Sequence, residues 1–162
     1  MKITQLLTDQ DPRKFPFSTL EQVPSWFTID GGESEEDIAD SFFSVTGLEP
    51  GDLRFEWSDT HNCNKLHWRN RTYLLSFTEE ESGNDKTVRA LDDIFSTTHQ
   101  IRLISPSIGT GGFDFVVLAH EEWTKLEAEN DLVRKWLIPI RSFPDLFNTP
   151  LSSLMEIGNV TV

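Results

Sequence analysis

The chain has 162 residues, of which 37% are hydrophobic and 11% aromatic, so it holds enough apolar material for one packed domain, which argues against wholesale disorder. Its 27 acidic residues stand against 14 basic ones, and the formal net charge of −13 argues against direct binding of DNA, RNA or anionic lipid. With one cysteine, Cys63, it cannot form an intramolecular disulfide, which fits a reducing compartment.

The start of the chain has no apolar signal segment after Lys2, and no run approaches the roughly 18 apolar residues of a membrane span. We therefore expect a cytoplasmic protein without a membrane-spanning segment.

Residues 1–30 mix three prolines with aromatic residues, which predicts an ordered, mostly extended arm that packs on the rest of a single domain spanning 1–162. A helix is expected next. Ser34 is a suitable N-cap, three acidic residues follow it in the first turn, and Gly47 is a stop signal.

From Leu53 onward, apolar and polar residues alternate. Three such runs, starting near Leu53, Leu66 and Tyr73 and joined by short polar turns, predict an antiparallel meander. A helix with an apolar stripe at Val88, Leu91 and Phe95 should follow, with its polar residues on the outer side; these are Lys86, Arg89, Asp92 and Asp93.

Residues 101–104 and 113–119 predict a fourth and a fifth strand, and residues 123–136 predict one or two helical segments with a break near Asn130. Prolines interrupt the tail. The expected fold is therefore α+β: one domain with an antiparallel sheet in the order β-β-β-α-β-β-α and helices packed mainly on one face.

No motif in the chain predicts catalysis or a cofactor. His61, Cys63, His67 and Asp59 are close in sequence, but their spacing matches no standard zinc pattern. The glycine-rich residues 109–112 lack the following helix and the basic residue of a phosphate-binding loop. No nucleophile motif is present, so we expect no metal, no cofactor and no enzymatic turnover.

Acidic residues gather in three stretches, near 30–40, 79–85 and 121–131. If the first two converge on one face, they form a surface for a basic protein, although three separate solvated surfaces would have the same composition. The expected partner contacts are Glu35, Glu36, Asp40, Glu79, Glu80, Glu81 and Asp85. An exposed Trp57 or Trp68 would serve as an aromatic anchor, although a core position is the commoner fate of either.

In size, acidity and local sequence pattern the chain resembles the bacterial immunity proteins that neutralise toxins of contact-dependent growth inhibition and other polymorphic toxin systems. The likeness lies in residues 66–75 (LHWRNRTYLL) and in residues 113–118 (FDFVVL), followed by Trp123. It implies stoichiometric binding and occlusion of a cognate toxin domain, often a basic nuclease, and it transfers no individual residue role.

Two other classes remain open at this stage. One is an inhibitor that mimics DNA, which shares the electrostatic argument. The other is an enzyme whose site is assembled from scattered residues such as His67, His99, Asp114 and His120. A deep pocket that gathers such residues would favour the enzyme.

Overall fold

A computed structural model of the chain describes residues 2–8, 15–75 and 82–159. The strands are β1 (Trp26–Ile29), β2 (Arg54–Ser58), β3 (Cys63–Trp68), β4 (Arg71–Leu75), β5 (His99–Ile104), β6 (Phe113–Ala119) and β7 (Leu137–Pro139). The α-helices are α1 (Ile3–Thr8), α2 (Glu35–Thr46), α3 (Gly83–Ile94), α4 (His120–Glu129), α5 (Leu132–Trp136) and α6 (Leu151–Ile157). Three short 3-10 helices are η1 (Phe17–Gln22), η2 (Ser105–Ser107) and η3 (Ile140–Ser142).

The α+β class and the antiparallel pairing are confirmed. The elements from β2 to α4 follow the predicted order, β2-β3-β4-α3-β5-β6-α4, and the break near Asn130 separates α4 from α5. The predicted alternation therefore identified the strands of the middle of the chain correctly.

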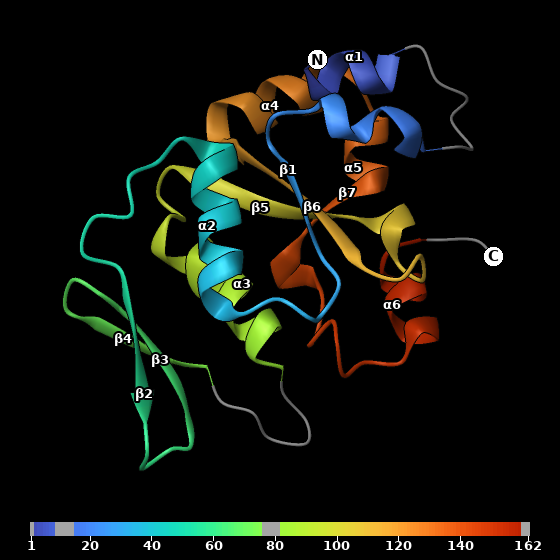
Figure 1. The fold of residues 1–162 in the computed structure, drawn as a ribbon. Helices are drawn as coiled ribbons and strands as arrows, with labels where there is room; N and C mark the ends of the chain where they lie inside the picture. Colours follow the sequence, from blue (N-terminus) through green and yellow to red (C-terminus); the bar gives the residue numbers. More distant parts are fainter. Residues whose placement is uncertain (1, 9–14, 76–81, 160–162) are drawn as a thin grey trace.

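The strands form two sheets, however, where one was expected. β2, β3 and β4 form a three-stranded sheet, while the four-stranded sheet has the order β1-β6-β5-β7 (Figure 1). The N-terminal arm supplies the edge strand β1, in which Trp26 pairs with Val116 and Ile29 with Phe113. Four residues flanked by Pro24 and Gly31 are too short for alternation to reveal a strand.

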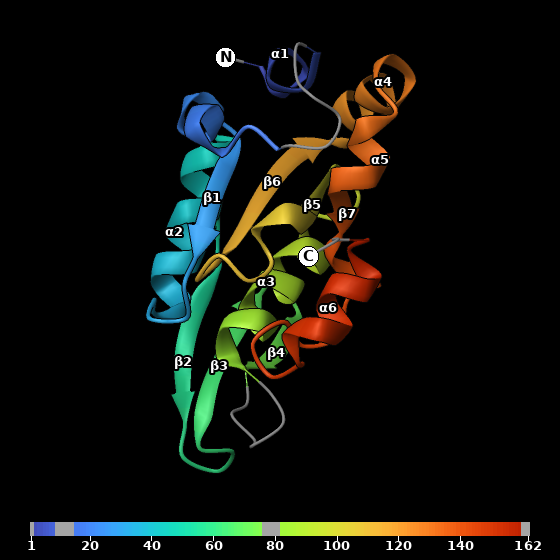
Figure 2. The same cartoon turned by 90° about the vertical axis from the view of Figure 1, so that its right-hand side faces the viewer.

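Helices cover both faces of the four-stranded sheet, which corrects the expectation of helices mainly on one face. Along β6, Phe113, Phe115 and Val117 point to one side and Val116 and Leu118 to the other, and all five are buried. Because both faces are apolar, both need cover. Figure 2 shows α2 on one side of the sheet and α4 and α5 on the other.

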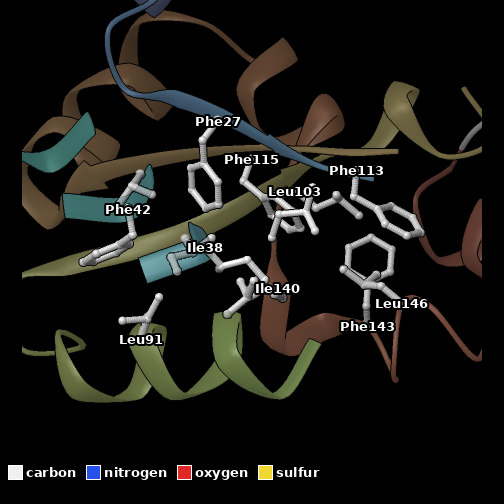
Figure 3. Packing of buried hydrophobic residues seen from close by; sticks show 14 of the residues in the cluster. Phe27, Ile38, Phe42, Leu91, Leu103, Phe113, Phe115, Ile140, Phe143 and Leu146 are labelled. Atoms are coloured by element: carbon white, nitrogen blue, oxygen red, sulfur yellow. The ribbon is translucent and has the colours of Figure 1, made fainter. Parts of the chain in front are cut away.

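The larger core cluster lies between the four-stranded sheet and helices α2 and α3. Phe27 stacks on Phe115 with ring centroids 5.3 Å apart, and Leu91 of α3 faces them (Figure 3). The tail adds Phe143 and Leu146 to the same cluster. The opposite face packs against side chains from α1, η1, α4 and α5, among them Trp123.

Helix α3 is wedged between the two sheets, and so its polar side is not solvated as expected. Asp92 is buried: it accepts hydrogen bonds from the backbone N–H of Ile101 at 2.9 Å and from Nε of Arg141 at 2.7 Å. The tail therefore folds back over a helix face that the sequence pattern assigns to solvent.

Helix α2 begins and ends where the sequence predicts. Ser34 and Asp37 form a reciprocal capping box, with 3.2 Å separating each backbone nitrogen from the other residue's side-chain oxygen. Gly47 ends the helix in the left-handed region at φ 67°. The two caps fix the position of the acidic first turn.

In the described part of the chain, every helix is too short or too polar to cross a lipid bilayer.

Candidate partner-binding surface

The outer side of α2 presents unpaired acidic side chains. Glu36 and Asp40 are exposed, one helical turn apart, and their carboxylates have no hydrogen-bond or ion-pair partner in the residues that the structure describes. Residues 30–53 contain no lysine or arginine, and their acidic residues are Asp30, Glu33, Glu35, Glu36, Asp37, Asp40, Glu49 and Asp52. The helix therefore carries negative charge without a local counterion.

The turn before α2 extends this acidic surface. The Glu33 carboxylate accepts hydrogen bonds from the backbone N–H of Asp30 at 3.1 Å and of Gly31 at 3.0 Å. Asp30 Oδ1 accepts from the N–H of Gly32 at 2.8 Å. These bonds hold both carboxylates in place ahead of the helix.

Trp57 is an exposed aromatic side chain beside the same helix end. It is 53% exposed, and its indole N–H donates to Asp59 Oδ1 at 3.0 Å. Trp57 lies directly opposite Asn64 in the β2–β3 pair, and Asn64 Nδ2 donates to Glu35 Oε2 at 3.2 Å. Figure 2 shows β2 and β3 extending past the N-terminal end of α2.

We call this combined region the α2–Trp57 surface. Its members are Asp30, Glu33, Glu36, Asp37, Asp40, Trp57 and Asp59. Of the two expected anchors, Trp57 is the exposed one, whereas Trp68 packs against Phe95 with ring centroids 5.4 Å apart.

Glu35 belongs to the boundary between α2 and β3, and only 7% of its surface is exposed. Among the residues that the structure describes, its buried Oε1 has no hydrogen-bond partner, while Oε2 accepts from Asn64. An enclosed carboxylate oxygen without a donor is energetically unfavourable, so this atom marks a place where a cation or a donor would be stabilising.

Asp85 has a structural position and does not join the surface. It is 2% exposed, pairs with Arg89 one turn later, and accepts from the backbone N–H of Leu146 at 3.0 Å. Burial raises the pKa of its carboxyl, and the hydrogen bonds from Arg89 and Leu146 oppose that shift. The expected contacts Glu79, Glu80 and Glu81 lie outside the described residues.

The residues named for an enzyme site do not gather in one place. His67, on the central strand β3 of the three-stranded sheet, has its Nε2 3.0 Å from Glu56, and Asp114 Oδ1 accepts from Nε1 of Trp26 at 3.1 Å. His120 Nε2 donates to the carbonyl of Ser96 at 2.7 Å. Only His99 of these four lines the cavity of about 560 Å³ between α1, α2, α4 and β6, and burial lowers its pKa.

The other motifs of the sequence have local roles. Within the described residues, no three His, Cys, Asp or Glu side chains are arranged to hold a metal ion. His61 Nδ1 instead lies 3.0 Å from Ser58 Oγ, in the turn after β2, and Cys63 is buried. The described lining of the 340 Å³ cavity beside residues 109–112 includes Asp30 and no basic side chain.

Sequence reasoning missed two features of this region: the burial of Glu35 against Asn64, and the contact of Asp59 with Trp57. The burial of Glu35 depends on Asn64, which is 29 residues away, and no local pattern shows it. Asp59 could have been found, because residues two apart at a strand end point to the same side, which places its carboxylate beside Trp57.

No family model matches the chain, and comparison with curated proteins and with solved structures finds no similar protein.

Proposed function

We propose that this chain is an immunity protein that binds a cognate bacterial toxin domain, a basic nuclease, and blocks its substrate-binding surface. The observation that supports the proposal is the α2–Trp57 surface: the carboxylates of Glu36 and Asp40 are unpaired in the described part of the chain, residues 30–53 contain no basic residue, and an exposed tryptophan lies next to them. Exposed tryptophans surrounded by polar groups are frequent anchors of protein interfaces.

The chemistry of a nuclease explains why such a surface is suited to inhibit it. A nuclease holds nucleic acid by neutralising phosphates with lysine and arginine, so its substrate-binding surface is cationic. The carboxylates of α2 can compete for that surface, and the net charge of −13 attracts the toxin from a distance. The inhibitor then needs no catalytic group of its own.

Growth protection tests this proposal. A candidate toxin domain, sought in the gene directly upstream of the one for this chain, is produced in cells with and without the chain, and the purified pair is analysed for a complex of equal stoichiometry. We expect the wild-type chain to restore growth and the double variant Glu36→Lys, Asp40→Lys to protect poorly.

Glu156→Lys is the matched control. It makes the same change of charge per substitution, at one exposed residue of α6, a helix that lies apart from α2 in Figure 2, so it should protect like the wild type. If the wild-type chain neither protects cells nor binds the toxin domain, the proposal is wrong. If the α2 double variant and Glu156→Lys lose growth protection equally, α2 is not part of the interface.

A further inference from the structure

The Trp57 side chain is both exposed and fixed in orientation. Its indole N–H is bonded to Asp59 Oδ1 at 3.0 Å, so the ring is held while 53% of the side chain stays accessible. A ring that is already ordered loses little conformational entropy when a ligand stacks on it.

Two carboxylates accompany this ring without a cationic partner. Asp59 is exposed, and neither it nor Glu35 forms an ion pair in the part of the chain that the structure describes. Glu35 is linked to the same place through Asn64, the residue opposite Trp57, and within the described ranges its buried Oε1 has no donor. Alternation along β3 puts the nearest lysine, Lys65, on the opposite face of the sheet.

The fold already contains the arrangement that would complete this site. Arg102 lies over the ring of Trp123 at 4.2 Å, and its Nη1 donates to Glu127 at 2.6 Å. The guanidinium thereby stacks on an indole and pairs with a carboxylate at the same time. Trp57 offers an exposed indole with the carboxylates of Asp59 and Glu35 close to it, so a guanidinium from another protein would form the same arrangement there.

We propose that Trp57, Asp59 and Glu35 form a recognition site for one arginine side chain of the partner protein. The guanidinium stacks on the exposed face of Trp57 and donates in its own plane to Asp59, while the nearby carboxylate of Glu35, held by Asn64, adds negative charge. A lysine ammonium cannot make both planar contacts, so arginine is favoured. The inference deepens the proposed function and names the group that the α2–Trp57 surface takes from the toxin.

The experiment uses the full chain and small probes, so it does not need the toxin. The indole N–H resonance of Trp57, assigned through Trp57→Phe, is followed by NMR during titration with N-acetyl-arginine methylamide. The lysine and norleucine analogues are the comparison probes. We expect a saturable shift with the arginine probe, a weaker one with lysine, almost none with norleucine, and no shift of the Trp123 resonance.

Variants separate the site from general acidity. Asp59→Asn keeps an acceptor for the indole and removes the charge. Glu35→Gln also removes a charge and keeps an acceptor for Asn64. Each variant should lower the affinity for the arginine probe by about threefold. Asp40→Asn removes one charge from the same surface and should leave its affinity unchanged.

The inference is overturned if the arginine probe causes no saturable shift, if norleucine shifts the resonance equally, or if all three variants behave alike. A failed probe titration together with growth protection by the wild type would reject the arginine site and keep the proposed function. If the arginine probe binds but the wild-type chain does not protect cells, the arginine site is kept and the proposed function is rejected.

Discussion

Arg102 shows how this acidic protein keeps a cation inside. It is only 7% exposed, yet it is stacked on Trp123, and its donors reach Glu127 at 2.6 Å and Gln100 at 2.8 Å. Glu127 also accepts from Arg134 at 3.2 Å. Burial alone would raise the pKa of Glu127, but the two arginines outweigh it and the pKa is lowered.

Glu127→Gln should destabilise the protein at neutral pH by about 1–3 kcal/mol, because it removes an ionic hydrogen bond of a buried arginine. A carboxyl with a lowered folded pKa stabilises the protein above its unfolded pKa, about 4.3–4.5, and that stabilisation is lost as pH falls through the folded value. The difference between wild type and variant, measured by urea unfolding, should therefore be full at pH 7 and shrink below about pH 4.5. A difference independent of pH down to 3 would contradict this account.

Truncation of Trp123 should lower the free energy of unfolding much more than truncation of Trp57. Trp123 is 2% exposed and its N–H donates to the carbonyl of Gln100, so Trp123→Ala should lower the free energy of unfolding by about 3–5 kcal/mol. Trp57→Ala should change it by less than about 0.5–1 kcal/mol, since the ring is mostly solvated. A large loss of stability for Trp57→Ala would mean that the ring serves the fold and not a partner.

Among the secondary-structure elements, α2 presents much of the acidic surface, and its caps determine where the helix begins and ends. Ser34→Ala removes one half of the capping box and should cost about 0.5–2 kcal/mol of unfolding free energy. Ser44→Ala, at an exposed position inside the same helix, is the control and should be neutral or slightly stabilising, because alanine is the better helix former. Thermal unfolding of both variants measures the difference. Equal effects would show that the cap contributes nothing.

How far the sequence predicts these elements depends on whether their signal is local. The alternation in residues 53–75 and the apolar runs at 101–104 and 113–119 identified five strands, and Ser34 and Gly47 located α2, because each signal lies within one element. The separation into two sheets and the strand β1 were missed, because they depend on pairing between residues far apart, such as Trp26 and Val116.

The same distinction between local signals and long-range contacts explains which acidic residues are exposed and which are buried. Glu36 and Asp40 are exposed, as their helix pattern predicts. Asp85 and Asp92 look equally solvated in sequence but are buried, since residues of the tail supply their partners, Leu146 and Arg141. Charge alone therefore does not tell a docking carboxylate from one that ties two segments together.

At the scale of the whole molecule, the charge is uneven. Residues 30–53 have no basic residue, whereas the next 18 residues, 54–71, contain Arg54, Lys65, Arg69 and Arg71. A cationic protein that approaches such a molecule is drawn toward α2 and away from the end of the three-stranded sheet that carries Arg54, Arg69 and Arg71, and this steering weakens as salt screens the field.

The most direct test of docking through α2 is the association rate with the toxin domain that the growth assay identifies, recorded by stopped-flow fluorescence from low to high ionic strength. We predict a wild-type rate that falls steeply with salt. Glu36→Lys with Asp40→Lys should lower the rate about tenfold at low salt and flatten its salt dependence, while Glu156→Lys should have a much smaller effect. A rate that is independent of salt, or equal for the α2 variant and the wild type, would contradict docking through the acidic face of α2.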